Sequence, residues 1–254
     1  MTKRTEIVFI LDRSGSMNRI KDDAIGGYNS FIKDQLALDG EERVRLVLFD
    51  DKVEIFEGLH ELDEKTYVPR GATALLDAIG IGVADVKESL SLIDSDEEVD
   101  VIVAIMTDGQ ENASKEYTKQ AINEIISEQT EKGWQFIFLG ANIDAVGTAR
   151  DLGINEKFAG GFIADSKGMG TAMLNANEMV MSYRSTGEMK SYEDVATSLS
   201  GSEDKDQKAK TSKHTEKEKD GTTRNLDEDA KKETKRLNED RENVANDKDN
   251  GGGK

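Results

Sequence analysis

The chain has 254 residues, of which 34% are charged, with a formal net charge of −18 and no cysteine. Residues 191–254 hold 14 Lys or Arg against 17 Asp or Glu, so the first 190 residues carry a net charge of −15. This acidity excludes a basic nucleic-acid-binding surface. The lack of cysteine excludes disulfides and thiolate metal sites. No apolar run approaches the roughly 18 residues of a membrane span, and the first, from Ile7, is too short for a signal peptide, so we expect a cytoplasmic protein that contacts neither nucleic acid nor membrane.

Short apolar runs rich in β-branched and aromatic residues predict buried strands. The four clearest runs cover 7–11, 44–49, 101–106 and 136–139. A further run over 53–56 follows the second one after Asp50-Asp51, which predicts a hairpin and therefore one antiparallel edge strand. A weaker strand is expected around 158–163.

Apolar residues at helical spacing separate these runs. They predict helices over 20–36, 75–90, 117–126, 142–152 and 166–183. Strands that alternate with crossover helices predict an α/β fold: a doubly wound, mostly parallel sheet with one antiparallel edge strand and helices on both faces, in a Rossmann-like arrangement. In the last helix, the methionines Met169 and Met173 are expected to face the core.

The end of the chain has a different composition. Between residues 191 and 254, 31 of 64 residues are charged and large apolar side chains are almost absent. Such a segment buries too little apolar surface to offset its chain entropy. We therefore predict a folded domain over 1–187 and a charged, disordered tail over 188–254.

Polar residues follow the ends of the predicted strands. Asp12-Arg13-Ser14-Gly15-Ser16 follows the first strand, and Thr107-Asp108-Gly109 follows the third buried strand. Gly71-Ala72-Thr73-Ala74 precedes the second predicted helix. Ligands of open α/β sheets bind at the carboxyl ends of the strands, where these three loops can meet.

Pooling the loops gives two carboxylates and three hydroxyls, from Asp12, Ser14, Ser16, Thr73 and Asp108. An all-oxygen set suits a hard cation, Mg²⁺ or else Mn²⁺ or Ca²⁺, and suits Zn²⁺ or copper poorly. Because hydroxyls are weak donors, the cation would stay electrophilic toward a further anionic ligand.

This ordered set resembles the metal-ion-dependent adhesion site (MIDAS) of von Willebrand factor type A (VWA) domains, of the stand-alone bacterial or phage kind. The resemblance covers roughly residues 5–185. It implies that Ser14, Ser16 and Thr73 ligate the metal directly, and that Asp12 and Asp108 do so directly or through water. It also implies that a carboxylate from a protein partner fills the remaining position.

The leading hypothesis is a non-enzymatic module that captures an Asp or Glu of a protein partner through the metal, in adhesion or as a scaffold. Arg13, Glu111 and Asn112 flank the site and are candidate partner contacts, although a solvent-facing or capping role fits them as well. The alternative is metal-assisted phosphoryl transfer or hydrolysis at the same sheet edge. An aspartyl-phosphate enzyme would want a second carboxylate where Ser14 stands, which disfavours it.

Overall fold

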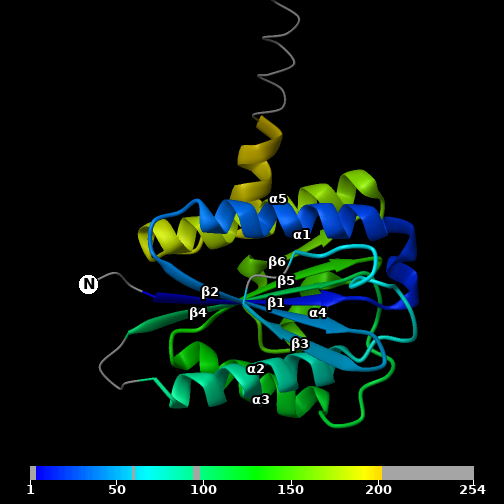
Figure 1. Cartoon of the computed structure of the whole chain (residues 1–254), viewed down its shortest axis with the longest axis horizontal. Coiled ribbons are helices and arrows are strands. Elements are labelled where there is room, and N and C mark those ends of the chain that lie inside the picture. The colour runs from blue at the N-terminus through cyan, green and yellow to red at the C-terminus, as the bar shows by residue number, and fades with distance from the viewer. Residues whose placement is uncertain (1–3, 59–60, 94–97, 202–254) are drawn as a thin grey trace, which may run out of the picture. The chain divides into compact units, whose positions relative to one another are not determined.

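A six-stranded sheet in the order β3-β2-β1-β4-β5-β6 forms the centre of the computed structural model (Figure 1). Its strands are β1 (Arg4–Asp12), β2 (Glu41–Phe49), β3 (Val53–Glu57), β4 (Val99–Thr107), β5 (Gln135–Ala141) and β6 (Ala159–Phe162). Neighbouring strands are parallel except β2 and β3, which confirms the predicted hairpin and its antiparallel edge strand. The structure describes residues 4–58, 61–93 and 98–201, so the tail from 202 onward lies outside the described residues.

Helices cover both faces of the sheet, as the predicted doubly wound fold requires (Figure 1). One face carries α1 (Lys21–Leu36) and α5 (Ser166–Thr186), and the other carries α2 (Leu75–Ser91), α3 (Lys119–Glu131) and α4 (Ala145–Asp151). Short 3-10 helices, Gly15–Ile20 and Glu156–Phe158, precede α1 and β6. Within the part of the chain that the structure describes, no helix is long and apolar enough to cross a membrane.

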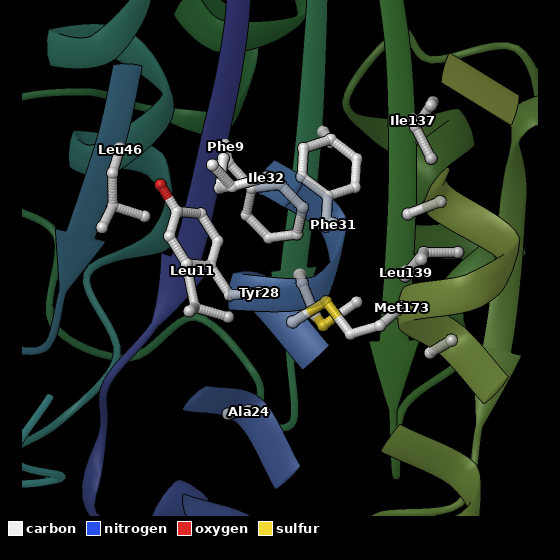
Figure 2. Close-up of a cluster of buried hydrophobic side chains, with 14 of the residues drawn as sticks. Phe9, Leu11, Ala24, Tyr28, Phe31, Ile32, Leu46, Ile137, Leu139 and Met173 are labelled. Carbon is white, nitrogen blue, oxygen red and sulfur yellow. The ribbon is translucent and has the colours of Figure 1, made fainter. Parts of the chain in front are cut away.

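The alternation of side chains along β1 divides the core into two layers. Ile7, Phe9 and Leu11 face α1 and α5, whereas Val8 and Ile10 face the opposite helices. Figure 2 shows the first layer, in which the Phe9 ring meets Tyr28 and Phe31 edge-on at centroid distances of 5.4 and 5.0 Å. Met169 and Met173 belong to this layer, as predicted. Because β1 is buried on both faces, its sequence is a continuous apolar run.

Two helices begin later than predicted because local polar groups set their first turns. The side chain of Asp144 accepts a hydrogen bond from the Gly147 N–H and starts α4 there, after Asn142 has taken a positive φ of 56°. Thr118 caps α3 in the same way. Tyr117 therefore lies outside the helix, where its ring packs so closely on Gly80 that a Cβ there would lie 2.5 Å from it.

The folded unit extends beyond the predicted boundary at residue 187 and spans Met1–Ser200. After α5, residues 192–201 form another helix. Its Val195 is 2% exposed in the core layer of α1 and α5, and the Tyr192 hydroxyl donates to the Gly161 carbonyl on β6 at 3.1 Å. The charge-based boundary misses this helix because its three apolar side chains that pack on the core, Tyr192, Val195 and Leu199, are scattered among polar residues.

This packing predicts the effect of truncation. A chain ending at residue 187 loses the burial of Val195 and uncovers part of the core, so we expect its free energy of unfolding to fall by at least about 2 kcal/mol. A chain ending at residue 201 keeps the helix and should match the full chain. Urea unfolding of the three proteins measures the difference. Equal stability of the 187 and 201 chains would show that the helix adds nothing.

Candidate metal site

The five predicted metal ligands lie at the carboxyl end of the parallel strands. Asp12 is the last residue of β1, and Asp108 directly follows the neighbouring strand β4. The loop before α2 brings Thr73 to the same edge, because Gly15 N–H donates to the Gly71 carbonyl at 3.3 Å. The convergence of three loops, expected from strand order alone, is thus present in the structure.

Asp12 is the buried anchor of the site, with a fully covered side chain. Its Oδ1 accepts the Ser14 N–H at 2.6 Å, and its Oδ2 accepts the Thr107 hydroxyl at 2.5 Å. The pKa of Asp12 is raised from 3.8 to about 6, chiefly by burial and to a smaller extent by the nearby Asp108 charge, although these hydrogen bonds lower it. A divalent cation would offset the repulsion between these two buried carboxylates and the cost of burying their charge.

The hydroxyls form a chain that reaches Asp108. The Oγ atoms of Ser14 and Ser16 are 3.0 Å apart, and Ser16 Oγ donates to Asp108 Oδ1 at 2.5 Å. Thr73 Oγ1 lies on the same side, since a Cβ at Gly109 would be 3.5 Å from it and 3.7 Å from Ser16 Oγ.

These spacings allow a test of fit. In an octahedron with metal–oxygen bonds of about 2.05 Å, adjacent oxygens are about 2.9 Å apart. The serine pair meets that spacing, and the Ser16–Asp108 pair needs only a small opening. In the described ranges no group of three or more His, Cys, Asp or Glu could hold a metal, so the hydroxyls are indispensable to any site here.

Access to the site comes from one side. Ser14, Thr73 and Asp108 are nearly covered, whereas Ser16 and Gly15 are exposed. The guanidinium of Arg19, more than half exposed, reaches Asp108 Oδ2 at 3.4 Å. A ligand that approaches the hydroxyls therefore meets the long cationic side chain of Arg19 at the rim. Arg19 was not among the residues predicted from the sequence.

Arg13, a predicted partner contact, points inward instead. It is 2% exposed and contacts Asp50 at 3.0 Å and Glu54 at 3.0 Å. Arg70 contacts the same two carboxylates at 3.0 and 3.1 Å, which closes a ring of four charges. The Arg70 N–H also donates to the Arg13 carbonyl at 2.9 Å. The ring thereby fastens the Asp12 loop to the β2–β3 hairpin and to the chain that leads to Thr73.

Glu111 and Asn112, the other two predicted contacts, hold loops together. Glu111 accepts hydrogen bonds from the backbone N–H groups of Leu76, Ala113 and Ser114 at 2.8 to 3.0 Å. Asn112 Oδ1 accepts the Thr73 N–H at 2.9 Å, and the Asn112 N–H donates to the Thr73 carbonyl at 3.0 Å. Asn112 is exposed and Glu111 is half-buried, so both, unlike Arg13, also remain accessible to a partner.

Two buried hydroxyls support Asp12 and were not identified from the sequence. Thr107 donates to the carboxylate, and the Tyr67 hydroxyl donates to the Asp12 carbonyl at 2.5 Å. Thr107 carries a weak signal, since it directly precedes Asp108 at the end of a buried strand. Tyr67 carries none, because it lies 55 residues from Asp12 in a loop with no strand or helix pattern.

The role of Thr107 gives a prediction. Thr107→Val keeps the shape but leaves Asp12 Oδ2 without its donor, so we expect Mg²⁺ affinity to fall about 10- to 100-fold, as for other groups that orient metal ligands. Thr107→Ser keeps the hydroxyl and should bind nearly as the wild type does. Calorimetric titration of Mg²⁺ compares the three. Unchanged affinity in the valine variant would remove Thr107 from the site.

Neither a scan against protein-family models nor a search of curated proteins finds a match. Solved structures do match. The vWF domain of the type V pili tip protein Mfa5 from Porphyromonas gingivalis is 13% identical with a TM-score of 0.53, covering 75% of this chain and 99% of that one. The pilus adhesin SpaC from Lactobacillus rhamnosus GG is 14% identical with a TM-score of 0.51, covering 69% of this chain and 30% of that one.

Proximal thread matrix protein 1 from the mussel byssus, solved with a zinc-occupied MIDAS motif, is 20% identical with a TM-score of 0.48. That match covers 69% of this chain and 45% of the mussel protein, so the chain spans less than half of that protein and of SpaC. At these identities the matches to Mfa5 and SpaC show the fold alone. The chain has a VWA-like fold.

Proposed function

We propose that the chain is a divalent-cation-dependent protein-binding module. Asp12, Ser14, Ser16, Thr73 and Asp108 would hold Mg²⁺, or Mn²⁺ or Ca²⁺, and an Asp or Glu side chain of a protein partner would complete the coordination. The observation that carries the proposal is the convergence of two buried carboxylates and three hydroxyls from three separate loops.

The donor set explains why a carboxylate is the proposed ligand. A bound cation would supply Lewis acidity, and hydroxyl donors neutralise it less than carboxylates do. The exposed edge at Gly15 and Ser16 leaves room for an external oxygen, and Arg19 at the rim adds a positive charge that attracts an anion. The chain's own acidity repels acidic surfaces at long range, so the partner carboxylate should stand in a neutral or basic patch.

The contacts of Asp12 argue against the enzymatic alternative. A phosphoryl-accepting carboxylate must present a free oxygen to the substrate, but both oxygens of Asp12 accept hydrogen bonds and the side chain is covered. Such an arrangement suits orientation of a metal or its water better than nucleophilic attack. Hydrolysis of a generic phosphate ester that requires Mg²⁺ and is lost in Asp12→Ala would reverse this assignment.

Calorimetric titration of Mg²⁺ and of Mn²⁺ into the metal-stripped chain tests the proposal directly. We expect one binding site in the wild type and none in Asp12→Ala or in Ser14→Ala/Ser16→Ala. The variant Ser30→Ala, on α1 away from the sheet edge, serves as the matched control and should bind as the wild type does. Absence of binding by the wild type at millimolar metal would sink the mechanism while leaving the fold intact.

A further inference from the structure

An apolar cavity opens beside the candidate metal site. It has a volume of about 330 Å³ and lies between the start of α2, the loop after β4, the start of α3 and helix α4. Leu75 and Leu152 form its covered floor, and Leu76 and Ile143 contribute partly buried side chains. The room suits one or two aliphatic side chains, and none of the proposed metal ligands lines it.

Gly109 connects the cavity to the metal site. It lines the cavity, and a Cβ there would stand within 3.5 Å of Thr73 Oγ1 and 3.7 Å of Ser16 Oγ. Gly109 therefore borders both the cavity and the hydroxyls of the candidate metal site. The Asn142 amide donates to the Asp108 carbonyl at 3.5 Å and ties the cavity's α4 side to the metal loop.

The charged groups around the cavity already have partners. Glu111 accepts hydrogen bonds from the Leu76 and Ser114 N–H groups, Asp144 caps α4, and Lys119 pairs with Asp151. These charged groups are satisfied by contacts within the fold, so the aliphatic walls of the cavity are the part of its lining that is available to an external side chain. The two carboxylates at the rim also disfavour a second acidic side chain there.

We propose that this cavity receives an aliphatic side chain of the same partner segment that supplies the carboxylate to the metal. In an extended segment, residues two apart point to the same side and are separated by about 6.5 Å. The recognised chemistry is therefore an Asp or Glu with Leu, Ile or Met two residues away. The inference rests on the proposed function and adds specificity to it.

The test uses two synthetic peptides, acetyl-Gly-Gly-Asp-Ser-Leu-Gly-amide and the same peptide with Ala for Leu. Each is titrated into the Mg²⁺-loaded full chain with ¹³C-labelled Ile and Leu methyl groups, followed by NMR. We expect the leucine peptide to bind about tenfold more tightly, because it buries three more carbon atoms. We also expect shifts at Leu75, Leu76, Ile143 and Leu152.

A cavity-filling variant provides the second readout. Thr148→Phe places a ring in the cavity and should abolish the preference for leucine while Mg²⁺ binding stays unchanged. Thr171→Phe, on the exposed side of α5, is the matched control and should retain the preference. Equal affinity of the two peptides, or no binding of the leucine peptide despite bound Mg²⁺, overturns this inference and leaves metal binding standing. Failure to bind Mg²⁺ at all overturns the proposed function and this inference with it.

Discussion

Replacing Asp12 by asparagine should stabilise the metal-free chain and remove its response to Mg²⁺. Burial of the ionised carboxylate, whose pKa is raised from 3.8 to about 6, costs about 3 kcal/mol relative to the unfolded chain above pH 6. Asparagine is neutral and keeps an oxygen for the Ser14 N–H. Its amide can donate to Thr107 Oγ1, because that hydroxyl has an alternative acceptor in the Gly109 carbonyl at 3.2 Å.

The pH dependence follows from the same group. Because the folded state binds this proton more tightly than the unfolded chain, Asp12 destabilises the metal-free protein above pH 6. The penalty disappears as the pH falls through 6 toward 4. In chelator near pH 8, Asp12→Asn should therefore be more stable than the wild type by up to about 3 kcal/mol. Near pH 4 the two proteins should be nearly equal.

Mg²⁺ should close most of this difference. At 100 times its dissociation constant a ligand stabilises the folded state by about 2.7 kcal/mol, which the wild type gains and the variant does not. Thermal unfolding with chelator and with Mg²⁺ measures both effects. Asp39→Asn removes an equal charge from an exposed turn and should follow the wild type in both conditions. An equal gain with Mg²⁺ in Asp12→Asn would show that Asp12 is not a ligand.

Arg45→Met should lower the free energy of unfolding by about 3–5 kcal/mol, because it strands a buried anion. Arg45 is fully covered on β2, where its guanidinium contacts Glu6 at 3.5 Å, pairs with Asp85 and donates to Ser89 Oγ at 2.9 Å. Neither carboxylate oxygen of the buried Glu6 has a hydrogen-bond partner among the described residues. The positive charge of Arg45 is therefore its main compensation.

A double-substitution cycle separates this effect from lost packing. Glu6→Gln/Arg45→Met removes both charges and should recover part of the loss, whereas Lys33→Met, at an exposed position of α1, should change stability by less than about 0.5 kcal/mol. Burial raises the pKa of Glu6 despite the opposing Arg45 charge, so Arg45→Met should regain stability as the pH falls. No recovery in the double variant would mean that packing, not charge, accounts for the loss.

The structure contains the predicted strands and the hairpin, whose prediction depended only on the local sequence pattern. Continuous apolar runs such as Ile7–Leu11 can be satisfied only by burial on both faces, and the hairpin at Asp50-Asp51 needs no distant partner. The five residues of the predicted metal site lie near one another for a related reason. Asp12 and Asp108 each directly follow a strand, and neighbouring parallel strands bring their carboxyl ends to one edge.

The sequence by itself therefore determined the layered sheet and the five residues gathered at its edge. Only the tertiary structure decided which side chains support them, because those partners are chosen by contacts between residues far apart in the chain. Arg13 could have faced solvent, but Asp50 and Glu54, 37 and 41 residues away, draw it inside. The helix at 192–201 likewise has a tail-like composition, and only the packing of Val195 into the core shows that it belongs to the folded unit. Composition and hydrophobic periodicity indicate the secondary structure and burial that each segment favours. The burial and the partners of an individual side chain depend on which residues the completed fold places next to it.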